Sequence, residues 1–548
     1  MKSIKQIVIL LFGFWSNHSY AQQKDVIQLT AAFDKILSEQ FKNNETGAVA
    51  LVAKNGQVIY SKAFGMSNLE LNTPMHTDNV FRIGSVTKQF TAIAILQLME
   101  QGKLNLQDDI TKFIPDYPVS GYHITIEHLL THTSGIANKT DITGDMGTLD
   151  LKPTEMIGHF KDQPMKFAPG TNYSYSNNGY FLLGYIIEKI TGKTYAEYLD
   201  EHFFKPLGMT NSLYADDIRI IKNRASGYTS GVHGFENASP LSMTQPYAAG
   251  SIQSTVLDLF KWHKAVHSYK LVKKETLEKA LTKYKLTDGK EITYGYGWRL
   301  GWVYDSPSTW HGGLINGFMS MVNYLPKEDV FVAVFSNCDC NSPEIVTSRL
   351  AAIASGKPYE YKEIAVRNSV LQEYIGVYEN QKGQQRIITV SENRLYSQIG
   401  RGPKANLKAY QKDMFFFDPI VTIEFSRNKK GEIDKTTSKN LGGNDVWHKT
   451  NKPIPDENGI KVEEKILETY IGQYEVTPDF SFSITKEQGK LFLHATGQEK
   501  VEIFAETATK FFLKINDAQI EFVKDNTGKL TKAILTQGGR QTDAKKIK

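Results

Sequence analysis

Apolar residues in the first two thirds of the chain follow two different periodicities. Residues 48–60 form two apolar runs on either side of Asn55 and Gly56, a pattern typical of a β-hairpin. Helical spacing follows in four segments, at residues 86–100, 124–131, 180–190 and 255–265. Apolar strand patterns return in three segments, at residues 297–304, 318–324 and 330–335. This order predicts an antiparallel sheet built from the two ends of one domain and covered by helices.

The last third of the chain contains the same small domain twice. Residues 371–379 recur as residues 467–475, at an offset of 96, and the register persists through later segments. Each copy has short alternating strands separated by Gly, Asn and Asp turn signals, which predicts an antiparallel barrel or sandwich. Neither copy has a catalytic constellation of its own. We expect a structural or substrate-gating role, with a ligand-holding barrel as the alternative.

Loss of apolar periodicity marks the boundaries between these parts. Turn formers and charged residues replace it around Gly356 and again over residues 451–459. The fold class is therefore predicted as α+β, with a mixed catalytic domain over residues 22–357. Two small all-β domains follow, over residues 366–450 and residues 466–548.

The first 21 residues have the features of a cleaved export signal. Two lysines precede an apolar run over residues 7–15, and Ser19 and Ala21 provide the small residues needed before a cut after Ala21. A membrane anchor needs about 20 apolar residues, and this run is shorter. We expect an exported protein, periplasmic or secreted, without a transmembrane segment in the mature chain.

Composition and charge narrow the function classes. Hydrophobic residues make up 41% of the chain, which is typical of globular proteins. The 64 basic and 59 acidic side chains give a net charge of +5 that is spread along the sequence, and this argues against a nucleic-acid partner. Cys338 and Cys340 suit neither a disulfide scaffold nor a four-ligand zinc site. We expect two ordinary side chains after a buried strand, with a local disulfide as the alternative.

The pattern Ser-x-x-Lys occurs three times, and its context separates Ser85 from Ser426 and Ser483. Only Ser85 follows a glycine and opens a long apolar helical run. Lys88, one turn later, can reach the Ser85 hydroxyl. A serine becomes a useful nucleophile when a neighbour takes its proton, and a lysine with a lowered pKa can do so. The alternative is a helix cap beside an exposed lysine.

Two later segments supply groups that could complete such a site. Tyr175 and Asn177 lie two residues apart before a helix, and they offer a phenol for proton relay and an amide for orientation. His311 precedes two glycines and Leu314, just before the strand at residues 318–324. The glycines would let a substrate backbone approach, and a following N–H could stabilise an oxyanion.

His128 and His132 are spaced as two metal ligands on one helix would be. Leu129, however, stands where a metalloprotease has its glutamate, and the sequence suggests no third ligand. We therefore expect no metal and no other cofactor. The two histidines are predicted to tie the helix to the turn at Thr133.

Taken together, these segments resemble the serine β-lactamase-like and penicillin-binding-protein-like hydrolases, a superfamily that includes class C β-lactamases, D,D-carboxypeptidases and esterases. Ser85 with Lys88, Tyr175 with Asn177, and His311 with Gly313 look like its three motifs in their usual order. The likeness covers roughly residues 24–357. The duplicated C-terminal part is similar in arrangement to the two barrels of the D-aminopeptidase type.

The resemblance implies acyl transfer through a covalent acyl-enzyme. Ser85 would attack a carbonyl group while Lys88 and Tyr175 move protons. Asn177 would orient the substrate, and the N–H groups of Ser85 and Leu314 would stabilise the oxyanion. Which of Lys88 and Tyr175 is the general base stays open at this point.

One departure from the class C pattern bears on the substrate. His311 stands where those β-lactamases carry a lysine, so a fixed cation is replaced by a group that is mostly neutral at pH 7. The histidine form is more similar to D-aminopeptidases and esterases. We expect a hydrolase of amide bonds in small peptides or peptidoglycan fragments, beside a D-residue. The alternatives are a carboxylesterase, a weak β-lactamase, and a penicillin-binding sensor without turnover.

Overall fold

The structure is a computed structural model, and it divides the chain into two units. It describes residues 27–138, 147–216, 218–231, 234–381, 383–456, 458–477, 480–514, 518–525, 527–537 and 540–547. The predicted export signal lies outside the described residues. The first unit is Met1–Glu360 with Asn440–Gly443, and the second is Tyr361–Lys439 with Asn444–Lys548.

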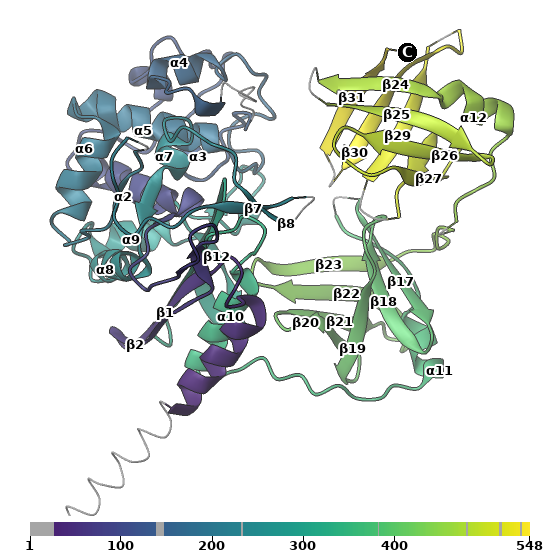
Figure 1. Ribbon diagram of the computed structural model, residues 1–548, viewed down its shortest axis with the longest axis horizontal. Helices are drawn as coiled ribbons and strands as arrows, with labels where there is room; N and C mark the ends of the chain where they lie inside the picture. The colour runs from purple at the N-terminus through teal and green to yellow at the C-terminus, as the bar shows by residue number, and fades with distance from the viewer. Residues whose placement is uncertain are drawn as a thin grey trace, which may run out of the picture. The chain divides into compact units, whose positions relative to one another are not determined.

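A six-stranded antiparallel sheet forms the centre of the first unit, in the order β12-β13-β14-β15-β1-β2 (Figure 1). Its strands are β1 (Ala48–Lys54), β2 (Gln57–Phe64), β12 (Arg299–Val303), β13 (Ser306–Ile315), β14 (Phe318–Leu325) and β15 (Val330–Ser336). β1 pairs with β15 along its whole length, so the early hairpin joins the late strands. The sheet predicted from the two ends of the domain is confirmed.

Helices cover both faces of this sheet because its central strands are apolar on both sides. In β1 the side chains of Ala48, Ala50 and Val52 pack with the helix at residues 27–40 and with α10 (Glu344–Ala354). The alternate residues of β1, namely Val49, Leu51 and Ala53, belong to a second apolar cluster on the opposite face of the sheet. This cluster includes residues of α2 (Thr87–Glu100) and α8 (Val256–His267). A strand buried on both faces has a continuous apolar run instead of an alternating one.

The remaining elements of the first unit connect this sheet to a helical region. The other helices are α3 (Ile126–Leu130), α4 (Pro153–Gly158), α5 (Asn177–Thr191), α6 (Tyr195–Leu199), α7 (Tyr247–Gly250) and α9 (Lys274–Ala280), with the short turns η1 (Gly84–Val86), η2 (Ile110–Lys112) and η4 (Asp200–Phe204). The short strands are β3 (Met66–Asn68), β4 (Thr73–Pro74), β5 (Phe81–Arg82), β6 (Leu213–Tyr214), β7 (Tyr228–Gly231), β8 (Gly234–Asn237), β9 (Ile252–Ser254), β10 (Tyr284–Lys285) and β11 (Glu291–Ile292). Within the described part of the chain, no helix has both the length and the apolar character needed to cross a bilayer.

The strand β13 is the main element that the hydrophobic pattern does not predict. It has ten residues and carries His311 and Gly313 in its second half, where sequence analysis placed only a segment before the next strand. Serine, glycine and histidine interrupt its alternation, so its strand character comes from pairing with β12 and β14 rather than from local preference.

Two glycines allow η1 to pack directly against β13. A Cβ on Gly313 would lie 2.0 Å from the Ile83 carbonyl oxygen. Gly84 has φ +50°, and a Cβ there would lie 3.0 Å from the Leu314 nitrogen. The backbone that contains Ser85 therefore touches the backbone of β13 with no side chain between them.

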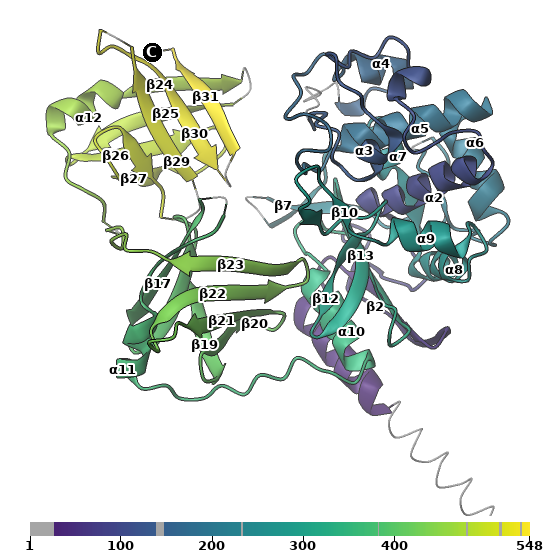
Figure 2. The ribbon, with the colours of Figure 1, turned by 180° about the vertical axis from the view of Figure 1, so that it is seen from behind.

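The second unit contains two closed eight-stranded barrels (Figure 2). The first is built from β16 (Gly376–Glu379), β17 (Gln385–Ser391), β18 (Arg394–Ile399), β19 (Ala405–Gln411), β20 (Met414–Asp418), β21 (Val421–Arg427), β22 (Ile433–Asn440) and β23 (Gly443–Lys449). The second is built from β24 (Gly472–Thr477), β25 (Phe480–Glu487), β26 (Lys490–Ala495), β27 (Val501–Ala505), β28 (Lys510–Phe512), β29 (Ala518–Lys524), β30 (Leu530–Gln537) and β31 (Arg540–Lys546). The helical segments α11 (Asn368–Leu371), η5 (Gln372–Tyr374) and α12 (Glu464–Tyr470) precede the barrels.

The two barrels share one strand register. Gly376 is opposite Ile388 in the first barrel, and Gly472 is opposite Ile484 in the second. Both residues of the second pair lie 96 positions after their counterparts, which is the offset of the sequence repeat. The predicted duplication and the barrel form are confirmed.

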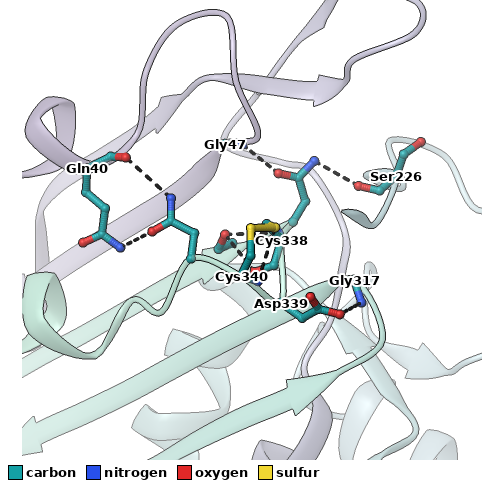
Figure 3. The surroundings of a disulfide bond; sticks show 10 residues. Gln40, Gly47, Ser226, Gly317, Cys338, Asp339 and Cys340 are labelled. Carbon is teal, nitrogen blue, oxygen red and sulfur yellow. Dashed lines mark hydrogen bonds between the residues drawn. A yellow bond between two sulfur atoms is a disulfide. The ribbon is translucent and has the colours of Figure 1, made fainter. Parts of the chain in front are cut away.

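Cys338 and Cys340 form a disulfide, so the expectation of two ordinary side chains is wrong and the alternative holds. The segment around them is a junction (Figure 3). Asn337 accepts a hydrogen bond from the Gly47 N–H at 2.7 Å, and Asp339 accepts one from the Gly317 N–H at 2.9 Å. The start of β1 is thereby connected to the turn between β13 and β14.

The contact between η1 and β13 predicts an asymmetric response to two neighbouring substitutions. Gly313→Ala should lower the free energy of unfolding by about 1–3 kcal/mol, because its methyl group would overlap the Ile83 carbonyl oxygen. In Gly312→Ala, the matched control, the nearest atom lies 3.5 Å from the new Cβ, so the change should stay within about 0.5 kcal/mol. Urea denaturation of the full chain, followed by tryptophan fluorescence, measures both. Equal effects would contradict the tight packing.

Candidate active site

The side chain of Lys88 is completely buried and yet carries an ionisable amine. It is 0% exposed, and its Nζ lies 2.8 Å from Asn177 Oδ1 and 2.8 Å from the Ala249 carbonyl oxygen. The rings of Tyr175 and Tyr180 lie 4.8 and 5.5 Å from the same nitrogen. Burial lowers the pKa of Lys88 well below its ordinary value, and the Arg299 cation lowers it further.

Ser85 lies on η1, immediately before α2, and its hydroxyl faces this amine. The Ser85 Oγ lies 3.1 Å from Lys88 Nζ. η1 continues directly into α2, which contains Lys88, and residues three apart lie on one helical face, so Ser-x-x-Lys brings the two groups together. A neutral amine has two N–H donors and one lone pair. In this structure Nζ donates to Asn177, Ala249 and Ser85, which suits the ammonium form. In the neutral amine, Asn177 and Ala249 can take the two N–H groups, and the lone pair can then face the Ser85 hydroxyl.

Tyr175 and Asn177 reach Lys88 from the segment that leads into α5. Ser176 between them is extended, with φ −135° and ψ 115°, and its side chain caps the helix by accepting from the Gly179 N–H. Burial raises the pKa of Tyr175, and its hydrogen bond with Ser85 counteracts only part of that effect. The phenol is therefore protonated at neutral pH and lies beside the serine hydroxyl.

The second half of β13 borders the serine along an open edge. β12 pairs with β13 only up to Trp310, and in the described part of the chain no other strand pairs with the following residues on that side. Leu314 lies on this edge with its side chain 61% exposed, and its backbone nitrogen approaches Gly84 closely. The N–H groups of Ser85 and Leu314 thus belong to two segments in direct contact, as an oxyanion hole requires.

His311 is a buried, neutral residue of β13, three positions before Leu314. It is 1% exposed, its Nε2 lies 3.0 Å from the Tyr294 hydroxyl, and its Nδ1 lies 2.7 Å from the Gly312 carbonyl oxygen. A carbonyl can only accept, so Nδ1 carries the proton and Nε2 accepts from Tyr294. Burial lowers the pKa of His311 well below its usual value, and the Arg299 cation lowers it further.

Arg299 is a site residue that sequence analysis missed. Its guanidinium Cζ lies 5.4 Å from the Tyr175 ring, 5.8 Å from that of Tyr294 and 5.3 Å from that of Trp310. It also interacts with the Tyr173 hydroxyl, and no carboxylate among the described residues forms an ion pair with it. A lone arginine at the start of a strand has no sequence signature, so only the fold reveals this cation beside the site.

His132 has a role that its spacing from His128 does not suggest. α3 ends at Leu130, and His132 has φ +59°, so the two histidines do not share a helix face. His132 Nδ1 accepts from the Ser176 N–H at 3.1 Å, and its ring lies 4.2 Å from that of Tyr175. It holds the segment between Tyr175 and Asn177. The signal that could have found it is the Thr-Ser-Gly sequence that follows it, which is typical of a tight turn.

The arrangement has the parts needed for nucleophilic acyl transfer. Ser85 is the only one of the three Ser-x-x-Lys serines that lies on a turn beside a buried amine. Asn177 and Ala249 fix the direction of that amine, and Tyr175 can pass a proton between the serine and a leaving group. The site residues predicted from sequence lie on η1, α2, the start of α5 and β13.

Comparisons with known proteins agree with this geometry. The family model described as "Beta-lactamase" matches residues 29–355, and a domain of unknown function, DUF3471, matches residues 361–450 and again residues 456–546. The chain is 27% identical to penicillin-binding protein 4* of Bacillus subtilis (strain 168) over 429 residues, covering 71% of this chain and 91% of the relative.

Two solved structures are also similar. The octameric penicillin-binding protein homologue from Pyrococcus abyssi has a TM-score of 0.55 and 28% identity, covering 77% of this chain and all of its own. A D-stereospecific amidohydrolase from Streptomyces sp. has a TM-score of 0.50 and 25% identity, covering 56% of this chain and 94% of its own. With the family match over more than half its length, this chain belongs to the beta-lactamase family of serine hydrolases.

Proposed function

We propose that this enzyme hydrolyses an amide bond next to a D-residue in small peptides or peptidoglycan fragments that carry a free carboxylate. The observation that carries the proposal is the Arg299 guanidinium beside the cluster of Ser85, Lys88 and Tyr175. Among the described residues, no carboxylate forms an ion pair with it. The localisation expected from the export signal would give the enzyme access to such fragments.

Acylation begins with proton transfer from Ser85. Burial and the nearby Arg299 charge lower the pKa of Lys88 and so favour its neutral form, while burial raises the pKa of Tyr175 and keeps the phenol protonated. This favours Lys88 as the base that accepts the Ser85 proton, and Tyr175 as the group that protonates the leaving nitrogen. The serine oxygen bonds to the carbonyl carbon, and the C–N bond breaks as the amine departs with the Tyr175 proton. Lys88 then returns to Tyr175 the proton that it took from Ser85. Water then releases the acid and restores Ser85.

Arg299 supports a substrate with a carboxylate. A guanidinium offers two parallel N–H donors to the two oxygens of a carboxylate, and its aromatic neighbours hold it in one plane. His311 is neutral and buried and does not supply that charge. Arg299 on β12 thus supplies the positive charge that a lysine at the position of His311 would give in class C β-lactamases. This charge favours a peptide with a free carboxylate over a simple ester.

Support for D-specificity comes from a relative. A structure similar to this chain is that of a D-stereospecific amidohydrolase, and chirality at the residue beside the scissile bond decides which face of the carbonyl meets the nucleophile. A penicillin-binding protein without turnover is the alternative from another class, since relatives carry that name. Stable acylation without product would favour it.

Ser85→Ala should remove covalent labelling by a fluorophosphonate or a labelled penicillin, because the nucleophile is gone. Intact mass spectrometry of the purified chain measures the adduct. Ser426→Ala, which alters another Ser-x-x-Lys serine, is the matched control and should label like the native chain. An adduct that survives Ser85→Ala would contradict the assignment, and so would the absence of any adduct on the native chain.

Arg299→Gln should raise KM for a peptide ending in D-alanine by about tenfold or more, since a charge-assisted pair is lost. The same variant should barely change kcat/KM for the corresponding peptide amide, which has no carboxylate, when both enzymes are measured on the pH-independent plateau above the acid limb. Liquid chromatography of the products measures both, with L-alanine peptides and p-nitrophenyl esters as comparison substrates. Equal losses on acid and amide would overturn the carboxylate role, and preference for the esters would favour the carboxylesterase.

The acid limb of the pH profile should also depend on Arg299. Acylation needs neutral Lys88, so kcat/KM rises with pH through the pKa of this amine. Arg299 lowers that pKa, so Arg299→Gln should move the limb to higher pH, while Arg299→Lys should leave it nearer the native position. Profiles measured with a neutral peptide amide separate this effect from substrate binding. A limb that stays in place in Arg299→Gln would show that another group controls it.

A further inference from the structure

The interior of the first barrel holds a buried arginine without an acidic partner. Arg386 lies on β17 two residues before the core residue Ile388, so its side chain points to the same interior face. It is 4% exposed, it donates to Ser397 Oγ at 3.3 Å, and its Cζ lies 4.8 Å from the Trp447 ring. Among the described residues none forms an ion pair with it. Asp445 has only a longer-range electrostatic effect on the pKa of Arg386, and its side chain is exposed.

Polar atoms around this arginine lack hydrogen-bond partners within the described part of the chain. They are Arg386 Nε, Trp447 Nε1, Thr436 Oγ1 and Ser438 Oγ. Thr436 is opposite Phe425 and Ser438 is opposite Ile423, and both partners belong to the barrel core. Opposite residues share a face, so both hydroxyls point inward. Most buried polar groups in folded proteins are paired, so four unpaired atoms in one interior point to a ligand.

The second barrel shows that the fold does not need these polar residues. Tyr378 is opposite Arg386 in the first barrel, and Tyr474 is opposite Phe482 in the second, so Arg386 and Phe482 are equivalent. By the same register, the positions of Ser397, Thr436, Ser438 and Trp447 in the first barrel are taken in the second by apolar residues, in order Leu493, Ala533, Leu535 and Ala544. All of them belong to, or pack against, its apolar core.

The same comparison places the unpaired groups next to one another. Ala533 and Ala544 are direct cross-strand partners in the second barrel. Thr436 and Trp447 occupy the equivalent positions in the first, so the hydroxyl and the indole belong to neighbouring strands. The indole in turn stacks with Arg386.

The charge of Arg386 decides which ligand fits. Burial lowers its pKa to about 10, so the guanidinium remains charged at neutral pH. Water could satisfy the N–H and O–H groups but would leave this charge unbalanced in the interior. A planar carboxylate matches the fork of donors on a guanidinium, and it carries the one negative charge that balances one cation.

We propose that the interior of the first barrel binds a small monocarboxylate through Arg386, with the Trp447 N–H and the Thr436 and Ser438 hydroxyls as further donors. The indole ring forms an apolar wall beside the guanidinium. This site is distinct from the Ser85 site, and its residues all lie on β17, β22 and β23.

The test uses the full chain labelled with 5-fluorotryptophan and titrated with sodium acetate at constant ionic strength. The Arg299→Gln background removes the carboxylate contact expected at the catalytic site. We expect the ¹⁹F signal of Trp447, assigned with Trp447→Phe, to shift saturably with acetate. Acetamide, which has the same shape without the charge, should not shift it.

Two substitutions locate the binding. Arg386→Phe copies the residue of the second barrel and should abolish the acetate-dependent shift while the barrel still closes. Thr436→Val keeps the side-chain shape and should weaken acetate by about fivefold to tenfold, the worth of one hydrogen bond. Thr437→Val, at the next position and on the outer face, is the matched control and should bind like the native chain.

Several outcomes would overturn the proposal. No shift of the Trp447 signal with acetate would mean that the polar interior is satisfied by water alone. A shift with sulfate or phosphate but not acetate would assign a different anion class. An equal response to acetamide would also refute the carboxylate site, and so would unchanged acetate affinity in Thr436→Val. The result with Thr436→Val can be interpreted even if Arg386→Phe does not fold.

Discussion

The burial of the Lys88 amine is the constraint on which the catalytic domain depends. An ammonium group taken out of water is costly, so the surrounding structure must supply hydrogen bonds or remove the charge. Here α5 and α7 provide two acceptors, from Asn177 and Ala249, and aromatic rings exclude water. Burial and the Arg299 charge favour the neutral amine, whose lone pair can then face Ser85. The packing that buries the Lys88 amine therefore also activates the Ser85 nucleophile.

The sheet supplies the second half of the site because its strands come from distant parts of the chain. β13 extends past the end of β12, which leaves an open edge beside the serine turn. Contact at this edge requires the absence of side chains at Gly84 and Gly313. The same arrangement puts Arg299, at the start of β12, over the Tyr175 ring. This end of the sheet therefore provides both an N–H group for the oxyanion, from β13, and a cation for the substrate, from β12.

The duplicated domain separates what a barrel requires from what a ligand would require. Both copies close with the same strand register. The second fills its interior with apolar side chains, whereas the first keeps Arg386 and Trp447 inside with donors that have no hydrogen-bond partner among the described residues. Polar groups that the fold does not need, and that cost stability when unpaired, are most simply explained by a binding role.

The sequence by itself determined the elements that depend on local periodicity and on short spacings. The duplication, the two-ended sheet, and the approach of Ser85 to Lys88 follow from residues near one another in the chain or from repeated patterns. Tertiary structure alone decided the rest. The strand character of β13, the cation at Arg299, the contact of His132 with Ser176 and the neutral state of His311 all depend on neighbours distant in sequence. The shift of a pKa from its ordinary value, and the partner of a buried polar atom, are set by distance and solvent exclusion, so both are decided only when the chain folds.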